Sequence, residues 1–154
     1  MKRVAVFPGS FDPITKGHEE IVRRAASMFD EIIVAVGRNT SKAYLFSEEQ
    51  RLSWVRDTFA DVSHVRVEFF EGLTIDFCKK NEAHFILRGA RNSADFEYEM
   101  AIAHMNKAMW QEVETIVLFS DPLYISTSST IIREIIKNKG PVSQFLPNRV
   151  NVYG

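Results

Sequence analysis

Residues 4–18 read VAVFPGSFDPITKGH. The run Val4–Phe7 is apolar throughout, which predicts a buried strand, and a helical pattern begins near Gly17. Gly9 and Gly17 leave room for a phosphate or a base to approach the backbone, and the amino terminus of a helix presents unpaired N–H groups and the positive end of its dipole. His18 would project into the same space. We therefore interpret the segment as an anion site with a donor side chain, the alternative being a plain strand, turn and capped helix.

Strands and helices alternate along the rest of the chain. Apolar runs rich in Val, Ile and Phe predict strands at Val4–Phe7, Ile32–Val36, Val65–Phe70, Phe85–Leu87 and Ile116–Phe119. Apolar stripes with helical spacing predict helices at Gly17–Phe29, from Ser47 with Gln50 completing a capping box, at Leu73–Lys80, at Ser93–Trp110 and at Ser128–Lys139, where Gly140 and Pro141 supply a stop. We expect residues 1–154 to form a single Rossmann-like α/β domain, a five-stranded parallel sheet with helices on both faces. In such a sheet, ligands bind beyond the carboxyl ends of the strands.

The composition argues against several classes of protein. The formal net charge of -1 and the lack of a basic, aromatic stripe argue against a nucleic-acid partner. No segment approaches the roughly 20 apolar residues of a membrane span, and the first apolar run is too short for the core of a signal peptide. The single cysteine, Cys78, cannot form an internal disulfide. We expect a cytoplasmic protein with no membrane partner.

Two more segments with phosphate-binding chemistry follow predicted strands. Tyr124–Arg133 reads YISTSSTIIR and opens the last helix, where hydroxyl and N–H groups can hold phosphate oxygens and where an arginine is unexpected unless an anion balances it. Arg88–Arg91 reads RGAR, and two guanidinium groups around small residues suit a phosphate clamp. An ordinary helix cap and an exposed basic loop are the alternatives. One edge of the sheet is therefore expected to gather the cationic and donor side chains of His18, Lys42, Arg88, Arg91 and Arg133.

The first and last of these segments resemble the two signatures of the nucleotidyltransferase superfamily. Thr15–His18 is similar to its Thr/His-x-Gly-His element, and Ser128–Arg133 is similar to its Ser-Ser-Thr-x-x-Arg element. Within that superfamily, Asp95–Met100, Ala103–Asn106 and Phe145–Pro147 are similar to the pattern of the phosphopantetheine adenylyltransferase family. The resemblance covers essentially the whole chain.

The sequence departs from the family pattern in mild ways. Ser10 stands where the family often has Thr and keeps the hydroxyl group. Lys16 stands where the family usually has Asn and adds a positive charge beside the expected phosphate site. Thr127 stands where Ser is common.

The resemblance implies a reversible transfer of AMP from ATP to 4′-phosphopantetheine, which gives dephospho-coenzyme A and pyrophosphate in coenzyme A biosynthesis. It implies catalytic roles for His18, Lys42 and Arg91. It implies ATP contacts from Ser10, Phe11, His18, Gly89, Ala90, Arg91, Glu99, Tyr124, Ile125, Ser126, Thr127, Ser128, Ser129 and Thr130. It implies contacts with phosphopantetheine from Ser10, Lys42, Leu73, Thr74, Arg88 and Asn106. It also implies a homohexamer and feedback binding of coenzyme A.

A magnesium ion is expected to accompany ATP, held mostly by phosphate oxygens and water rather than by the chain. His64, His84 and His104 have no metal-ligand spacing, so we predict no metal ligands in the protein. The apolar residues on more than one face of the long helix, which include Ile102 and Met105, suggest a subunit contact.

Three other functions remain open from the sequence. A nucleotidyltransferase that acts on nicotinate mononucleotide or uses CTP would share both phosphate signatures, and only the Arg88–Arg91 and Asp95–Asn106 segments argue against it. A non-catalytic nucleotide sensor on the same fold would not need His18 and Lys42 together. A nucleic-acid module would need a more basic surface.

Overall fold

All five predicted strands form, and they make one parallel sheet. The computed structural model describes residues 1–154, and its strands are β1 (Val4–Gly9), β2 (Glu31–Arg38), β3 (Val65–Glu71), β4 (Phe85–Ala90) and β5 (Glu114–Phe119). Every neighbouring pair is parallel, in the order β3-β2-β1-β4-β5. Each strand extends beyond the apolar run that predicted it, because strand pairing continues through residues without large apolar side chains. The predicted α/β fold is confirmed.

The connecting helices are α1 (Lys16–Ala25), α2 (Glu48–Thr58), α3 (Thr74–Lys80), α4 (Ser93–Met109) and α5 (Ser129–Lys137), with short 3-10 helices at Pro122–Tyr124 and Ser143–Phe145. None of them combines the length and the apolarity needed to cross a membrane.

Helix α4 ends one residue before the predicted Trp110, and two helices end earlier than predicted by two residues or more. Helix α1 stops at Ala25, and the turn that follows carries Phe29 into the core. Helix α5 stops at Lys137, because Lys139 has a left-handed backbone with φ 56° and the Gly140 N–H returns to the Ile135 carbonyl at 2.9 Å. Such a return bond satisfies a carbonyl that the helix leaves free.

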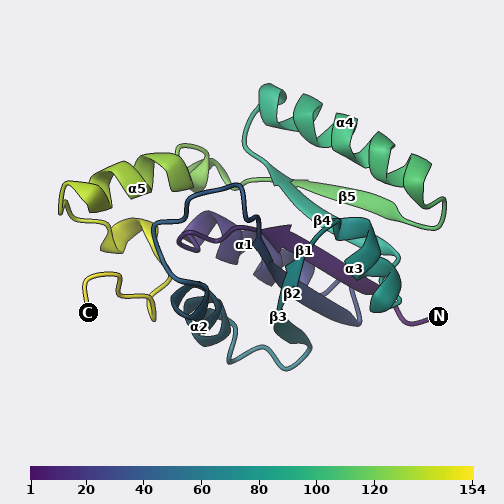
Figure 1. Cartoon of the computed structure of the whole chain (residues 1–154), viewed down its shortest axis with the longest axis horizontal. Helices are drawn as coiled ribbons and strands as arrows, with labels where there is room; N and C mark the ends of the chain where they lie inside the picture. Colours follow the sequence, from purple (N-terminus) through teal and green to yellow (C-terminus); the bar gives the residue numbers. More distant parts are fainter.

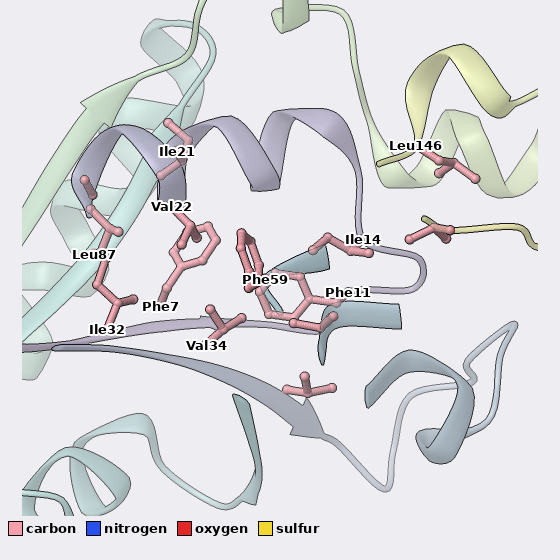
Figure 2. Close-up of a cluster of buried hydrophobic side chains, with 14 of the residues drawn as sticks. Phe7, Phe11, Ile14, Ile21, Val22, Ile32, Val34, Phe59, Leu87 and Leu146 are labelled. Atoms are coloured by element: carbon pink, nitrogen blue, oxygen red, sulfur yellow. The ribbon is translucent and has the colours of Figure 1, made fainter. Parts of the chain in front are cut away.

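Helices cover both faces of the sheet (Figure 1). Successive strand residues point to opposite faces, so Phe7 of β1 belongs to one hydrophobic cluster and its neighbour Val6 to another. The first cluster includes side chains of α1, α2 and α5, and Figure 2 shows Phe7 and Val22 between α1 and the sheet. The second includes side chains of α3 and packs against Trp110, which follows α4.

The pairing of β1 decides where the sheet opens. Strand β1 pairs with β2 along all of Val4–Gly9, but it pairs with β4 only through Ala5 and Val6. The chain leaves β1 toward β2 on one side and later returns to β4 on the other side. This is the switch point at which α/β sheets bind ligands. Beyond Val6, a ligand can enter between the carboxyl ends of β1 and β4.

Helix α2 begins with the capping box that the sequence predicts. The Gln50 N–H donates to Ser47 Oγ and the Ser47 N–H donates to Gln50 Oε1, both at 3.1 Å. We expect Ser47→Ala to lower the free energy of unfolding by about 1 kcal/mol, because a first-turn N–H loses its acceptor. Urea unfolding at a fixed protein concentration measures the change. Ser53→Ala, at an exposed position of the same helix, is the control, and an equal loss in both variants would contradict the capping role.

Candidate active site

Two cavities open at the carboxyl edge of the sheet and share a wall between β1 and β4. The α4 cavity has a volume of about 450 Å³ and the α1 cavity a volume of about 370 Å³. The residues common to both are Pro8, Gly9, Ser10, Arg88 and Glu99. The α4 cavity is further lined by Gly37, Arg38, Asn39, Tyr44, Phe70, Gly72, Thr74, Ile86, Tyr98, Ile102, Ala103, Asn106 and Thr115. The α1 cavity is further lined by Phe7, Phe11, Thr15, Gly17, His18, Ile21, Gly89, Arg91, Asp95, Ser120, Tyr124, Thr127, Ser128, Ser129 and Thr130.

The loop after β1 folds back and carries His18 to the α1 cavity. Phe11 has a left-handed backbone with φ 48°, which a bulky residue adopts only when its surroundings hold it there. Its ring lies so close to Gly9 that a Cβ atom on Gly9 would be 3.0 Å from the ring. The His18 ring meets the Phe11 ring edge-on, with the ring centroids 5.0 Å apart. Gly9 therefore makes room for Phe11, and Phe11 supports the orientation of His18.

The hydrogen bonds of His18 decide which ring nitrogen carries the proton. The Thr15 N–H donates to His18 Nδ1 at 3.0 Å and the His18 N–H donates to Thr15 Oγ1 at 3.2 Å, so His18 takes the place that Glu or Gln has in other capping boxes. Because Nδ1 accepts a hydrogen bond, the proton of the neutral ring lies on Nε2. Burial of the ring, aided by the charges of Arg88 and Arg91, lowers the pKa of His18 to about 4. At neutral pH, His18 is a neutral hydrogen-bond donor.

Arg88 bridges the opening between β1 and β4. Its Nε and Nη2 donate to the two carboxylate oxygens of Glu99 on α4, each at 2.7 Å, and its Nη1 donates to the Pro8 carbonyl at 2.7 Å. A guanidinium group has five N–H donors, so two of them remain for a ligand where the cavities meet. Both oxygens of the buried Glu99 bind Arg88, so Glu99 orients this cation.

Arg91 fastens the loop after β4 to the segment before α5. Its Nε donates to Asp95 Oδ2 at 2.9 Å, and its Nη1 donates to the Thr127 carbonyl at 3.3 Å. The hydrogen bond from Arg91 holds the pKa of Asp95 below its ordinary value, so this carboxylate stays ionised at neutral pH. Arg91 thus stands as a fixed cation in the wall of the α1 cavity.

The amino terminus of α5 leaves its N–H groups free. Ser128 makes no side-chain cap, and the N–H groups of residues 129–131 have no acceptor in the chain. Free N–H groups at the positive end of a helix dipole are a binding site for anions. Helix α1 differs, because Thr15 and His18 cap it.

Lys42 reaches the shared wall from the loop after β2. Its Nζ donates to Ser10 Oγ at 3.0 Å. Asp12 fastens the two loops together, because its buried carboxylate accepts the N–H groups of Leu45 and Phe46 at 2.8 and 3.0 Å. Ser10 lines both cavities, so the pair that it forms with Lys42 lies where the cavities meet.

Known proteins resemble this chain along almost its whole length. Residues 6–135 match the sequence model of the cytidylyltransferase-like family. The chain is 48% identical to the phosphopantetheine adenylyltransferase of Flavobacterium johnsoniae over 97% of this chain and 98% of that relative. It is 50% identical to the phosphopantetheine adenylyltransferase of Flavobacterium psychrophilum over 97% of this chain and 99% of that relative. The chain belongs to the phosphopantetheine adenylyltransferase family. It is therefore a nucleotidyltransferase, as its two signatures predict.

The phosphopantetheine adenylyltransferase family shares its fold with more distant proteins. A crystal structure from Vibrio parahaemolyticus, of a protein described as a nicotinate-nucleotide adenylyltransferase, superposes with a TM-score of 0.71 over 95% of this chain and 94% of that one. The sequence identity is 17%, so the likeness concerns the fold alone. Within the family, the phosphopantetheine adenylyltransferase of Levilactobacillus brevis is 44% identical over 96% of this chain and 91% of that relative.

Most of the residues predicted from the family pattern line a cavity. Those in the α1 cavity are Ser10, Phe11, His18, Gly89, Arg91, Glu99, Tyr124, Thr127, Ser128, Ser129 and Thr130. Those in the α4 cavity are Ser10, Thr74, Arg88, Glu99 and Asn106. Their contacts with ligands remain predictions.

Five predicted residues lie outside both cavities. Lys42 is exposed and approaches them through Ser10 and the Tyr44 ring. Leu73 stands exposed at the start of α3, and Ile125 and Ser126 are exposed before α5. Ala90 is buried and lines a separate hollow beside Phe96 and Phe119.

Arg133, which was expected in the cationic cluster, also lies outside the two cavities. Its Nη1 donates to the Asp12 carbonyl and its Nη2 donates to Thr130 Oγ1, both at 3.2 Å. These bonds tie α5 to the loop after β1. The two signature segments of the family therefore lie on the same side of the molecule.

Sequence reasoning missed much of the wall that α4 contributes. Ile102 and Ala103 line the α4 cavity together with Glu99 and Asn106. These positions are spaced by three, four and seven residues, so they share one face of the helix. That spacing, counted from Glu99, is the signal that would have found them.

No group of three or more His, Cys, Asp or Glu side chains is arranged to hold a metal ion. The carboxylates near the cavities already accept hydrogen bonds, Asp12 from backbone N–H groups, Asp95 from Arg91 and Glu99 from Arg88.

The pKa of His18 can be measured directly. In the ligand-free protein, a ¹H–¹⁵N NMR titration of the ring should give a pKa of about 4 with the proton on Nε2 above that pH. ATP should raise this pKa, because negative phosphate groups near the ring favour the imidazolium form. Adenosine, which carries no phosphate, is the control and should leave it unchanged. A ligand-free pKa near 6.5, or an equal response to both ligands, would contradict this description of the site.

Proposed function

We propose that the chain transfers AMP from ATP to the phosphate of 4′-phosphopantetheine, giving dephospho-coenzyme A and pyrophosphate. The observation that carries this proposal is the shared wall at Ser10 and Arg88, where two cavities meet beside His18, Lys42 and Arg91. One cavity suits a triphosphate and the other suits a long, mainly uncharged arm that ends in a phosphate. Membership of the family supports the same reaction.

ATP would occupy the α1 cavity. The free N–H groups at the start of α5 and the fixed Arg91 favour the β- and γ-phosphates. The two remaining donors of Arg88 and the Nε2–H of His18 then lie toward the α-phosphate. This assignment agrees with the family roles of Ser128–Thr130.

Phosphopantetheine would occupy the α4 cavity. Its phosphate would lie against Ser10, Lys42 and Arg88, where the cavities meet. Its amide-containing arm would run along α4, where Asn106 and Thr74 provide polar groups within a mostly uncharged wall.

The reaction needs no general base. A phosphate oxygen of the acceptor is already an anion at neutral pH, and it attacks the α-phosphorus of ATP in line with the bond to the bridging oxygen. The new P–O bond forms as that bridging bond breaks, and the electron pair leaves with pyrophosphate. Two polyanions must approach each other, so positioning and electrostatic stabilisation do most of the work.

His18 would stabilise the charge that develops on an α-phosphate oxygen. Its Nε2 carries a proton whether the ring is neutral or protonated, because the Thr15 N–H occupies Nδ1 of the neutral ring. The donor is thus in place before the reaction begins, which is the property that makes such groups effective.

Mg²⁺ would enter as part of the nucleotide. The carboxylates of the site already bind arginine side chains or backbone N–H groups, which fits an ion held by phosphate oxygens and water. The ion would offset part of the triphosphate charge.

We also propose a homohexamer, coenzyme A as a feedback ligand, and a cytoplasmic location. Exposed apolar side chains on α4, such as Tyr98, Met105 and Met109, support a contact between subunits. Coenzyme A contains both an adenine nucleotide and the phosphopantetheine arm, so it suits the two joined cavities. Burial raises the pKa of the free Cys78 thiol to about 12, which suits a reduced structural cysteine.

The acceptor can be identified by pyrophosphate release from ATP. We expect release to depend on 4′-phosphopantetheine and to be at least about a hundredfold slower with nicotinate mononucleotide, because nicotinate mononucleotide has no long arm to occupy the α4 cavity. CTP in place of ATP should likewise support little release. A chain that binds ATP but releases no pyrophosphate with any acceptor would instead be a nucleotide sensor, and the proposal would fail.

Two substitutions at His18 separate catalysis from capping. His18→Ala removes both the Nε2–H donor and the capping box, whereas His18→Gln keeps a residue that completes a capping box. We expect kcat to fall by at least about a hundredfold in both variants, the scale of losing one preorganised donor. The dissociation constant of ATP should change much less. His84→Ala is the control, because His84 contacts Glu112 and Trp110 away from the cavities; wild-type turnover in either His18 variant would refute the catalytic role.

A further inference from the structure

Arg51 on α2 is fully buried, and no carboxylate forms an ion pair with it. Its Nη1 donates to the Ser10 carbonyl at 2.7 Å and to the Gly37 carbonyl at 3.1 Å. Its guanidinium carbon lies 3.9 Å from the centroid of the Tyr44 ring. Its Nε and Nη2 have no acceptor in the chain. The family pattern assigned no role to this residue.

A buried cation of this kind needs an explanation. Removing a charge from water costs free energy, and only a well-placed partner offsets that cost. The folded protein would often be more stable with an apolar residue of similar size at such a position. Contact with the Tyr44 ring offsets part of that cost. The pKa of Glu48 is lowered mainly by its hydrogen bond with Arg38 and also by the charge of Arg51, but Glu48 makes no ion pair with Arg51. Arg51 therefore brings a positive charge behind Ser10 without an ion-pair partner.

Three contacts of Arg51, with Ser10, Gly37 and Tyr44, lie at the wall of the α4 cavity. Ser10 is held from one side by Arg51 through its carbonyl and from the other side by Lys42 through its hydroxyl. Gly37 and Tyr44 line the α4 cavity. One guanidinium thus joins the end of β1, the end of β2 and the loop that carries Lys42.

We propose that Arg51 is a positioning residue for the acceptor phosphate. It holds the Ser10 and Gly37 carbonyls so that Ser10 Oγ and Lys42 Nζ converge, and it adds positive charge behind them. This inference rests on the proposed function, which puts the phosphate of phosphopantetheine at Ser10.

The test compares two ligands that differ by one phosphate. The dissociation constants of 4′-phosphopantetheine and of pantetheine are measured by calorimetry for the wild type, Arg51→Met and Arg51→Lys. The dissociation constant of pantetheine divided by that of 4′-phosphopantetheine is the ratio that reports how strongly the phosphate is recognised. We expect Arg51→Met to lower the ratio at least about tenfold, the scale of a lost charge-assisted interaction. Binding of pantetheine and of ATP should stay within about threefold of the wild type. Arg51→Lys keeps the charge but lacks the planar guanidinium group whose Nη1 donates to both carbonyls, so its ratio should lie between those of Arg51→Met and the wild type.

Arg23→Met is the matched control. Arg23 also anchors α2, by donating to the Thr58 carbonyl at 2.8 Å, but it contacts neither cavity. Thermal unfolding checks that the variants are folded. If Arg51→Met does not fold, Arg51→Lys provides the test by itself. A ratio in Arg51→Lys equal to that of the wild type would then overturn the proposal.

The outcomes are distinguishable from a failure of the proposed function. If the wild type itself binds pantetheine as tightly as phosphopantetheine, the placement of the acceptor is wrong, and this inference falls with it. If the wild type recognises the phosphate but Arg51→Met weakens both ligands equally, or neither, Arg51 is only a structural residue. If the ratio falls in Arg51→Met and not in Arg23→Met, the positioning role is supported.

Discussion

The bidentate pairing of Arg88 with Glu99 is the interaction on which the rest of the site depends. Strands β1 and β4 stop pairing after two residues, which opens the sheet at its switch point. Glu99 approaches the opening from α4 and Pro8 approaches it from β1, and both bind the same guanidinium. Two points of attachment fix the plane of the group. The cation that both cavities share therefore has one orientation before any ligand arrives.

The positive charges of Arg88 and Arg91 have two effects on the site, one on ligand binding and one on the protonation of His18. Arg88 and Arg91 suit the α1 cavity to a triphosphate, and together with burial they keep His18 unprotonated. The carboxylates of Glu99 and Asp95 bind these arginines and so hold them in place. A chain with a net charge of -1 can in this way concentrate cations at one edge. Donors fixed in advance need little rearrangement when charge moves during the reaction.

The sequence predicts what local patterns encode. Apolar runs located all five strands, and Ser47 with Gln50 located the start of α2. The helix ends were less certain, because the end of α5 depends on a left-handed Lys139 that no periodicity marks. Contacts between residues that lie far apart in the sequence could not be predicted from local patterns either. Glu99 could be assigned only by family likeness, and nothing in the sequence singled out Arg51, because its partners, Ser10 and Gly37, lie 41 and 14 positions away.

Helix α4 connects the site to the proposed assembly. Its only buried residues are the polar Glu99 and Asn106, while Tyr98 and Met105 are 61% and 66% exposed. Most helices are held in place by an apolar face packed on their own core, and α4 turns much of its apolar surface outward instead. A contact that covered this surface would stabilise the position of α4. Because Glu99 on α4 orients Arg88, such a contact would also steady the cation at the centre of the site.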